Sequence, residues 1–556
     1  MPTLRIALAQ LNTAVGDLAA NRNRVAEAIL RAKAWRADLV AVPELALTGY
    51  PPEDLLLKPR FVEDNLRMLE RLEPMARGLA AVVGCVERGR RGELYNAAVV
   101  LADGRRAASY YKQCLPNYGV FDEQRYFAPG SGPAVLDVGG VRVGLTICED
   151  LWAESPVRVL AEQGCRLVMN LSASPYHADK LRQRQQLFAR RARTCRVAIA
   201  YCNLVGGQDE LVFDGGSLVL DARGRLMACG WQFREDLVIA DLDLPASAGK
   251  RRGVPIPWTP LRRSPAMPTR RAVLSPLEER YAALVLGLRD YVRKNGFETV
   301  VLGLSGGIDS ALTCCLAVDA LGKAHAIGVV MPSRFSSPDT QRDAAALARR
   351  LGIRCEELPI EPCFTAYRDT VKRLFGRRPA DVTEQNLQAR IRGTLLMALS
   401  NKFGWLVLTT GNKSEMATGY CTLYGDMAGG FAVIRDVPKT LVYALSRWRN
   451  RRGRPIPERV FTRAPTAELA PNQRDTDTLP PYAVLDPILK AYVEEDKSAP
   501  DILRTARFKP ETVRRVIRMV DRSEYKRRQG PPGIKITPKA FGKDRRMPIT
   551  NRYRES

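Results

Sequence analysis

The chain has 556 residues and a formal net charge of +26 at pH 7, with 46% hydrophobic and 26% charged residues. This composition excludes fibrous and disordered classes, and the length predicts two or three domains. No apolar run is long enough to span a bilayer and residues 1–8 lead into a strand without a cleavage site, so we expect a cytoplasmic protein with no membrane partner. The basic excess is spread along the chain without a recognisable nucleic-acid module, which makes nucleic acid the less favoured partner.

The first half of the chain alternates short apolar runs with Arg-rich helical segments. Alternation on this scale predicts an α/β layer structure, with antiparallel pairing where a connection is short, as between Val86 and Ala97. The predicted strands are Arg5–Ala9, Leu39–Val42, Ala80–Val86, Ala97–Leu101, Val141–Ile147, Leu167–Leu171, Val197–Asn203 and Ser217–Leu220. The twelve cysteines have irregular spacings and no C-x-x-C pair, so neither a zinc site nor a disulfide framework is expected.

Three reactive side chains directly follow apolar runs of this half. Glu44 follows Leu39–Pro43, Lys112 follows Ala107–Tyr111, and Cys148 follows the strand Val141–Ile147. Strand ends are where α/β proteins collect functional groups. A thiol beside a cation can act as a nucleophile, a carboxylate can take and return its proton, and lysine can hold an oxyanion. Singly, each of the three residues is commonplace.

The sequence segments around these three residues carry more information than the residues alone. Pro43–Tyr50, Lys112–Tyr118 and Ile147–Trp152 resemble, in order and separation, the Glu-Lys-Cys motifs of the nitrilase superfamily. The resemblance implies an αββα sandwich and amide hydrolysis through a thioester. Glu44 would be the general base and acid, Lys112 the oxyanion stabiliser and Cys148 the nucleophile. The same resemblance points to contacts with a substrate glutamine from Tyr118, Ser174 and Lys180.

Between Ala246 and Pro276 the alternation stops and Pro and Arg dominate, which predicts a linker. The expected domains are therefore residues 1–245 and 277–556, joined by residues 246–276. A long amphipathic helix is predicted from Pro276, and it leads into the apolar strand Thr299–Leu304.

The turn Ser305–Ser310 that follows this strand opens another helix. Its paired glycines allow close backbone approach to an anion, and the helix N-terminus adds positive potential. The turn lacks the Lys-Ser/Thr ending of a P-loop. An ordinary glycine turn would explain the two glycines but not the Asp and both serines. The turn resembles the pyrophosphate loop of the ATP-pyrophosphatase enzymes.

Later segments predict a doubly wound parallel sheet with its ligands at the carboxyl ends of the strands. The predicted elements are strands Ala324–Met331 and Trp405–Thr410, helices Thr340–Leu351 and Gln385–Lys402, a helical stretch Asp501–Arg528 and a basic tail. Five segments extend the resemblance to NAD synthetases: Glu384–Arg392, Leu408–Glu415, Pro465–Leu469, Glu524–Gly533 and Asp544–Arg546.

The two halves together resemble the glutamine-dependent NAD synthetases over nearly the whole chain. In that family glutamine is hydrolysed in the first domain and ammonia passes inside the protein to the second, where it displaces AMP from adenylated deamido-NAD. The resemblance implies ATP as co-substrate and a homo-oligomer. Its ATP contacts map to Gly303, Leu304, Ser305, Gly306, Gly307, Ile308, Asp309, Ser310 and Thr410, and its deamido-NAD contacts to Asn386, Glu415 and Lys526.

Asp309 and Glu415 are paired acidic groups suited to a Mg²⁺ ion that bridges phosphates. From charge and position alone, Lys413 is predicted to neutralise phosphate.

Other enzymes carry a similar loop, including GMP synthetase, asparagine synthetase and tRNA-thiolating enzymes. They would need a different amidotransferase domain, an N-terminal cysteine nucleophile, or paired catalytic cysteines in the second domain. Here Met1 is followed by Pro2, and the later cysteines show no pairing logic. A non-enzymatic binding protein would not need two catalytic sets.

Overall fold

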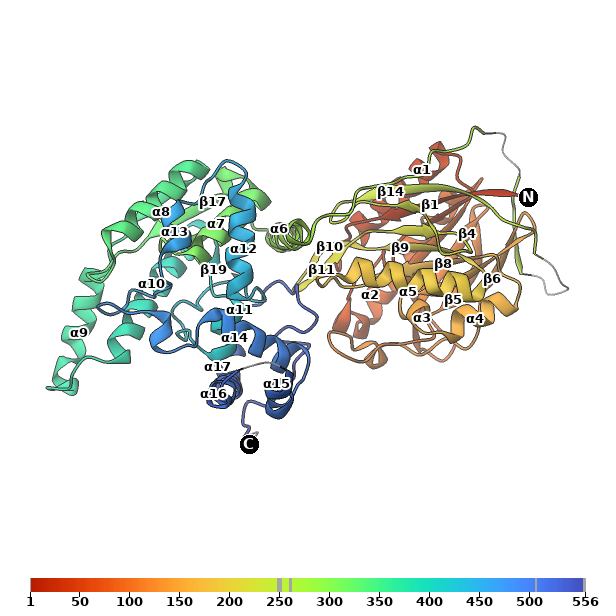
Figure 1. Ribbon diagram of the computed structural model, residues 1–556. Coiled ribbons are helices and arrows are strands. Elements are labelled where there is room, and N and C mark those ends of the chain that lie inside the picture. The colour runs from red at the N-terminus through yellow and green to blue at the C-terminus, as the bar shows by residue number, and fades with distance from the viewer. Residues whose placement is uncertain (1, 248–252, 260–262, 506–507, 554–556) are drawn as a thin grey trace. The chain divides into compact units, whose positions relative to one another are not determined.

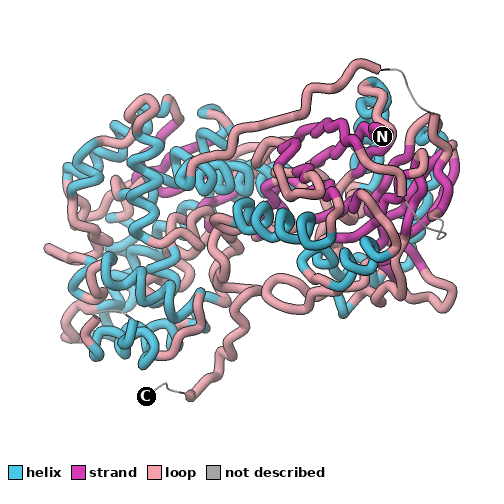
Figure 2. The backbone as a smooth tube through the Cα atoms, turned by 45° about the vertical axis from the view of Figure 1, so that its right-hand side comes forward, coloured by secondary structure: helices cyan, strands magenta, loops and turns pink. Residues whose placement is uncertain are grey.

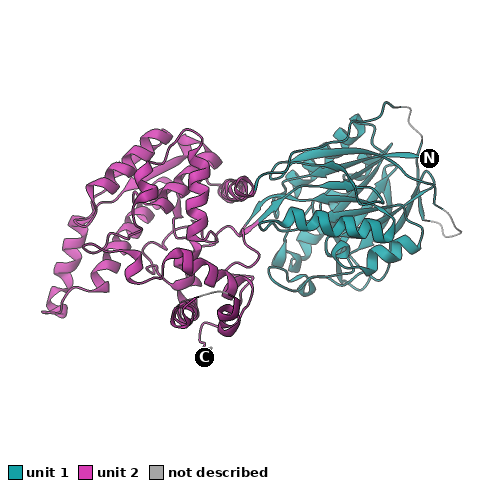
Figure 3. Cartoon of the chain, viewed as in Figure 1, with its two compact units in different colours: residues 1–208, 212–275 teal, residues 209–211, 276–556 magenta. Residues whose placement is uncertain are grey.

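The computed structural model describes residues 2–247, 253–259, 263–505 and 508–553 (Figure 1). Its internal contacts divide the chain into two compact units, Met1–Gln208 with Val212–Ser275 (unit 1) and Asp209–Leu211 with Pro276–Ser556 (unit 2) (Figure 3). Strands dominate unit 1 and helices dominate unit 2 (Figure 2). Within the expected linker, residues 248–252 and 260–262 lie outside the described residues, as do residues 554–556 of the expected tail.

Unit 1 is built on two mixed sheets, with strand orders β14-β1-β2-β3-β4-β5 and β13-β12-β9-β8-β7-β6-β15. Strands β10 and β11 form a separate hairpin. The strands are β1 Thr3–Gln10, β2 Leu39–Ala41, β3 Ala80–Arg88, β4 Leu94–Ala102, β5 Arg105–Tyr111, β6 Val135–Val138, β7 Val141–Ile147, β8 Leu167–Ser172, β9 Ala198–Asn203, β10 Val205–Gln208, β11 Leu211–Asp214, β12 Leu218–Leu220, β13 Leu226–Cys229, β14 Asp236–Asp243 and β15 Val254–Ile256.

The side chains of β1 alternate between two buried clusters, which shows how the layers form. Leu4, Ile6 and Leu8 enter a buried cluster shared with the second sheet, whereas Ala7 and Ala9 enter another cluster on the opposite face. Successive strand residues point to opposite faces, so one sequence serves both layers. Helices α1 and α2 cover the outer face of the first sheet, and α4 and α5 cover that of the second. The predicted αββα sandwich is confirmed.

The helices of unit 1 lie between these strands in the chain. They are α1 Leu18–Ala34, η1 Glu53–Leu57, α2 Pro59–Glu70, η2 Glu73–Ala76, η3 Glu123–Arg125, α3 Glu149–Trp152, α4 Ser155–Glu162 and α5 Lys180–Cys195. The antiparallel pair predicted around Val86 and Ala97 is confirmed, since β3 pairs with β4 in that orientation. Strand β15 adds to β6 at the sheet edge, within the stretch for which only a linker is expected.

Unit 2 contains a parallel sheet of order β18-β17-β16-β19-β20, which confirms the predicted parallel architecture. Its strands are β16 Val300–Gly303, β17 Ala326–Val330, β18 Arg354–Glu357, β19 Leu406–Thr409 and β20 Phe431–Ala432. Helix α10 packs on one face of the sheet through Ile391 and Leu396. Helices α6, α7 and α12 pack against one another beside the sheet.

The helices of unit 2 are α6 Pro276–Lys294, α7 Ile308–Leu321, η4 Lys323–His325, α8 Pro338–Leu351, α9 Glu361–Phe375, α10 Val382–Phe403, α11 Lys413–Thr418, α12 Lys439–Asn450, α13 Glu458–Thr462, η5 Asp475–Asp477, α14 Tyr482–Leu489, the π-helix η6 Lys490–Glu494, α15 Ala499–Thr505, α16 Pro510–Arg522 and α17 Glu524–Arg527. The helical stretch predicted for Asp501–Arg528 is confirmed in part, because it is divided among α15, α16 and α17. Lys509 is extended and Pro510 starts a new helix, because proline disfavours helical geometry in the residue before it. Among the described helices, none is long and apolar enough to cross a membrane.

Candidate active sites

Cys148 occupies a strained turn at the carboxyl end of β7. Its φ of 42° and ψ of −100° are rare for a residue with a side chain, and the turn places it at the start of α3. The Cys148 amide donates to the carbonyl of Leu171 at 2.8 Å, and its side chain is buried. A strained backbone persists only where the surrounding structure holds it in place. Strained residues of this kind are typical of functional sites.

Lys112 lies between two buried carboxylates. Its ammonium is 2.7 Å from Glu44 Oε1 and 2.8 Å from Glu123 Oε1, and the side chains of Lys112 and Glu44 have no exposed area. The Glu44 carboxylate also accepts from the amide of Ala173 at 2.8 Å and from Asn96 Nδ2 at 2.7 Å. The three predicted residues of the triad are therefore brought together, because Cys148 also interacts electrostatically with Glu44 and Lys112.

Burial controls the protonation of this cluster. Burial and the nearby Glu44 raise the pKa of the Cys148 thiol well above its ordinary value, although Lys112 and Ser172 act in the opposite direction. Burial raises the pKa of Glu123 to about 7. Burial opposes the charge of Lys112, but Glu123 and Glu44 outweigh it and raise the pKa of the ammonium. A thiol in this setting needs a carboxylate to take its proton before it can attack.

Two of the three predicted glutamine contacts, Tyr118 and Lys180, lie against α3. The exposed Tyr118 donates its hydroxyl to Glu149 Oε1 at 3.0 Å, and Lys180 Nζ lies 4.1 Å from the centroid of the Trp152 ring. Lys180 interacts electrostatically with Cys148 and Glu149. Burial, reinforced by the neighbouring Arg184, lowers the pKa of Lys180 to about 8.

Ser174 is buried, and its amide donates to Asn203 Oδ1 at 3.0 Å. Two acidic residues that directly follow the nucleophile were not selected from the sequence. Glu149 contacts Tyr118, while Asp150 accepts from the amides of Gln113 and Cys114 and so ties the segment after Lys112 to α3. Their adjacency to Cys148 is the signal that could have identified them.

In unit 2, the predicted anion loop connects β16 to α7. Gly306 has a φ of 74°, and a Cβ there would come within 2.2 Å of the carbonyl oxygen of Thr340. Only glycine fits this close approach. The Ser305 and Ser310 hydroxyls are 3.1 Å apart, and the amide of Gly307 donates to Ser305 Oγ at 3.2 Å.

Two adjoining cavities open at this loop. The larger, of about 420 Å³, is lined by residues 305–309 and by Asn386, Glu415 and Lys526. The smaller, of about 270 Å³, is lined by Gly303, Leu304, Ser305 and Thr410. The two cavities share Ser305, Thr340, Thr422, Asp426, Thr466, Ala467, Glu468 and Leu469. Of the predicted nucleotide contacts, Ser310 alone lies outside both linings, behind Ser305.

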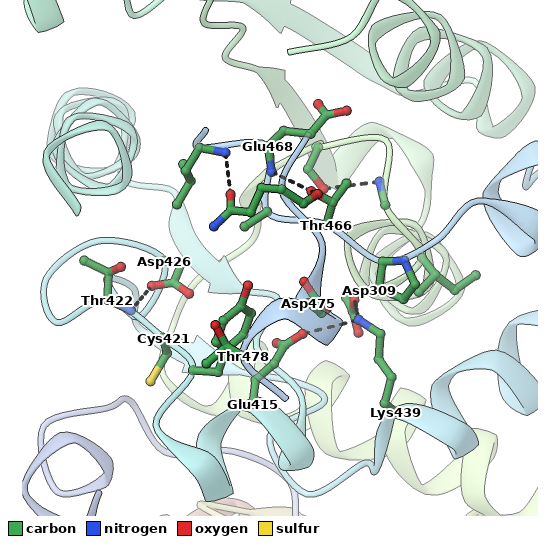
Figure 4. Close-up of a pocket in the computed structure, with 18 of the residues that line it drawn as sticks. Asp309, Glu415, Cys421, Thr422, Asp426, Lys439, Thr466, Glu468, Asp475 and Thr478 are labelled. Atoms are coloured by element: carbon green, nitrogen blue, oxygen red, sulfur yellow. Dashed lines mark hydrogen bonds and ion pairs between the residues drawn. The ribbon is translucent and has the colours of Figure 1, made fainter. Parts of the chain in front are cut away.

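The carboxylates of Asp309 and Glu415 meet the ammonium of Lys439 in the larger cavity (Figure 4). Lys439 Nζ lies 2.5 Å from Asp309 Oδ2 and 3.3 Å from Glu415 Oε1. Asn412 Nδ2 donates to Asp309 Oδ1 at 2.9 Å, and the Asn412 side chain caps α11, which carries Glu415. Burial, with Asp309 adding to it, raises the pKa of Glu415 to about 8, although Lys439 opposes the shift.

These oxygens suit a hard divalent cation, which typically takes one or two protein carboxylates together with phosphate oxygens. The residues that the structure describes contain no ready-made cluster of three or more His, Cys, Asp or Glu side chains for a metal. Asp309 and Glu415 therefore fit Mg²⁺ only where phosphates complete its shell.

The prediction that Lys413 neutralises phosphate at this site is wrong. Lys413 lines neither cavity, because its ammonium is buried against Asp436 at 2.9 Å, Glu494 at 2.6 Å and Thr537 Oγ1 at 2.7 Å. Lys439, at the start of α12, provides the ammonium instead. Two of the predicted deamido-NAD contacts, Lys526 and Asn386, form hydrogen bonds nearby. Lys526 Nζ donates to the carbonyls of Gly419 and Cys421, each at 2.8 Å, and Asn386 Oδ1 accepts from Thr422.

Two family models match the chain. A carbon-nitrogen hydrolase model matches residues 5–252 and an NAD synthase model matches residues 280–530. The glutamine-dependent NAD(+) synthetase of Thermotoga maritima is 49% identical, with the whole of both chains covered. That of Aquifex aeolicus is 45% identical, with 99% of this chain and 100% of the relative covered. The solved glutamine-dependent NAD+ synthetase of Acinetobacter baumannii, in complex with adenosine diphosphate, is 42% identical and superposes with a TM-score of 0.78 over all of both chains.

Proposed function

The chain belongs to the family of glutamine-dependent NAD(+) synthetases, which are ligases, and from this premise we propose that each unit performs one half of the reaction. In unit 1, glutamine is hydrolysed to glutamate and ammonia. In unit 2, ATP activates deamido-NAD and ammonia converts it to NAD. The observation that carries the proposal is the presence, in one chain, of a buried Cys-Lys-Glu cluster and of two adjoining cavities at a glycine-rich anion loop.

In the first half-reaction, Glu44 takes the Cys148 thiol proton as sulfur attacks the amide carbon of glutamine. Lys112 stabilises the oxyanion, because its ammonium is fixed by two carboxylates and needs no reorganisation. The tetrahedral intermediate collapses, the proton returns from Glu44 to the leaving nitrogen, and ammonia departs. Water, deprotonated by Glu44, then hydrolyses the thioester and releases glutamate and the thiol.

Glutamine is a zwitterion, and the groups near Cys148 match its two charged ends. Lys180 would receive the α-carboxylate and Glu149 the α-ammonium group, with Tyr118 covering them. Both side chains interact electrostatically with Cys148, which puts them within reach of the same small substrate.

In the second half-reaction, the carboxylate of deamido-NAD attacks the α-phosphorus of ATP. Pyrophosphate leaves and a mixed anhydride with AMP forms. Ammonia then attacks the activated carbonyl carbon, AMP departs with the electron pair of the anhydride bond, and NAD results after loss of a proton. We assign ATP to the 270 Å³ cavity and the anion loop, and deamido-NAD to the 420 Å³ cavity.

Mg²⁺, when bound by Asp309 and Glu415, would neutralise phosphate charge and assist the departure of pyrophosphate. Lys439 holds these carboxylates together and adds a cation beside the departing phosphates. Ammonia that travels inside the protein remains unprotonated and nucleophilic, which is the reason for placing both half-reactions in one chain.

The direct test is incubation with amide-¹⁵N glutamine, ATP and deamido-NAD, followed by mass analysis of the products. We expect NAD that carries the label, together with AMP and pyrophosphate. Unlabelled NAD would refute the use of glutamine, and ADP in place of AMP would refute the adenylate. Xanthosine monophosphate, aspartate and tRNA should not raise the melting temperature, whereas deamido-NAD with ATP should.

We also propose a homo-oligomer that acts in the cytoplasm, where ATP and glutamine are supplied. Support for the oligomer comes from exposed apolar side chains on α9 and α10, namely Tyr367, Leu374, Phe375, Val382, Met397 and Phe403. Light scattering after size exclusion would decide it, and a monomer at working concentrations would contradict it.

A further inference from the structure

A buried ion pair lies behind the candidate glutamine site. Arg184 on α5 pairs with Asp214 at the end of β11, and neither side chain has exposed area. Arg184 Nη1 also donates to the hydroxyl of Tyr201 on β9 at 3.2 Å. Two charges removed from water are costly unless they are paired, so their retention calls for an explanation beyond stability.

One chain of contacts leads from this pair to the nucleophile. Tyr201 is fully buried, and the hydroxyl of Ser172 lies near both the Tyr201 hydroxyl and the Cys148 thiol, where it favours the ionised form of each. Tyr201, to which Arg184 donates, therefore lies against Ser172 behind the nucleophile.

A second chain of contacts leads to the predicted glutamine contacts. Asn203 Nδ2 donates to Asp214 Oδ1 at 3.3 Å, and Asn203 Oδ1 accepts from the amide of Ser174 at 3.0 Å. Lys180 precedes Arg184 by four residues on α5, which places both on one side of the helix. The Arg184–Asp214 pair thus touches, directly or through one or two side chains, the neighbourhoods of Cys148, Ser174 and Lys180.

We infer that Arg184, held by Asp214, is a positioning residue of the glutamine site: it fixes Tyr201 and Ser172 behind Cys148 and lies one helical turn from Lys180. The inference rests on the proposed function of unit 1. Arg184 is separated from the thiol by Tyr201 and Ser172, so it acts through these side chains rather than on substrate.

The effect of Arg184 on the pKa of Lys180 has a defined direction. Burial and Arg184 lower the pKa of Lys180, while Cys148, Glu149 and Asp214 raise it, and the result is about 8. Lys180 therefore loses its positive charge as pH rises through about 8, and the KM for glutamine should increase there. Without the charge of Arg184, the pKa of Lys180 rises and the increase in KM moves to higher pH.

The test uses the full chain and follows glutamate release from glutamine as a function of pH. We compare Arg184→Lys, which keeps the charge, with the double variant Arg184→Met/Asp214→Asn, which removes both charges without leaving one unpaired. In the double variant we expect kcat to fall about tenfold or more and the rise in KM to move to higher pH, because Arg184 lowers the pKa of Lys180 more than Asp214 raises it. In Arg184→Lys we expect a similar loss in kcat, because lysine lacks the planar, two-pronged guanidinium of arginine. The pH profile should not shift, because the positive charge is kept.

Ammonium-dependent NAD formation measures the integrity of unit 2, and Arg190→Met, at an exposed position of the same helix, is the matched control. If both Arg184 variants retain the wild-type kcat and pH profile, the inference is refuted. If the double variant fails to fold, the kcat of Arg184→Lys decides the positioning role. Cys148→Ala is assayed in parallel, since glutamine hydrolysis in that variant would overturn the proposed function itself rather than the role of Arg184.

Discussion

The two candidate sites differ in how their charged side chains are balanced. In unit 1, Glu44 and Lys112 have no exposed side-chain area, and the ammonium is matched by carboxylates of the protein itself. In unit 2, the Asp309 and Glu415 side chains are each 17% exposed and face a cavity of about 420 Å³. The first site is complete before its substrate arrives, whereas the second leaves part of its charge balance to the ligands.

The difference follows from the proposed substrates. The reacting amide of glutamine is small and neutral, so a dry site with fixed charges can stabilise the oxyanion that develops from it. ATP and deamido-NAD are large polyanions, so a site that binds both needs volume, backbone donors and cations that are free to face phosphate.

The largest expected effect separates the two units. Cys148→Ala should lower glutamine-dependent NAD formation on the order of 10³-fold or more, because no nearby group replaces the nucleophile. NAD formation from ammonium should be nearly unchanged, as measured by NAD release with each nitrogen source. Loss of both activities would contradict two independent sites.

The reciprocal change is Asp309→Asn. It keeps the side-chain size and a hydrogen bond to Asn412, but it removes the charge that faces Lys439 and the proposed Mg²⁺. We expect NAD synthesis to fall by about 10² or more with either nitrogen source, because phosphate charge is then poorly stabilised. Glutamine hydrolysis, measured as glutamate release, should persist. Retained synthesis would exclude the metal role of Asp309.

A smaller effect is expected from the shape of the anion loop. In Gly306→Ala, the new Cβ would meet the Thr340 carbonyl in a backbone conformation that favours glycine, at a cost of about 1–3 kcal/mol. We expect the KM for ATP to rise about tenfold in ammonium-dependent assays. Gly307→Ala is the matched control, because its φ is negative and its nearest contact is a hydroxyl at 3.2 Å. Equal effects of the two changes would argue against the steric explanation.

The smallest effect is expected at the exposed rim of the first site. Tyr118→Phe removes only the hydroxyl that donates to Glu149 at 3.0 Å, and such a bond contributes about 0.5–1.5 kcal/mol. The KM for glutamine should therefore rise by roughly two- to tenfold with little change in kcat. A large fall in kcat would instead place Tyr118 in the chemical steps.

Much of the fold was predictable because strands and helices leave strong periodic patterns. Glu44 and Cys148 could be selected because each follows an apolar strand, and strand ends converge in layered α/β proteins. Glu123 could not, since it lies in a three-residue 3₁₀ helix within a loop, where no periodicity marks a side chain that turns inward.

The mistake over Lys413 has a related cause. Residues 412–415 begin a helix, in which Glu415 lines the cavity and Asn412 contacts Asp309, while Lys413 and Ser414 are buried against Glu494 and Asp486. A sequence does not reveal which side of a first helical turn faces a cavity. Lys439 is 24 residues beyond Glu415, and only the folded sheet brings the two together.

Two contacts of the Asn412 side chain limit which substitutions this position can accept. Elsewhere Asn, Asp and Ser are nearly interchangeable as helix caps. Here the same side chain that caps α11 also donates to Asp309, so aspartate would set two like charges against each other and serine would fall short of the contact. A position that looks exchangeable by local rules is thus constrained by its second contact, and attempts to raise thermal tolerance by cap redesign should leave it unchanged.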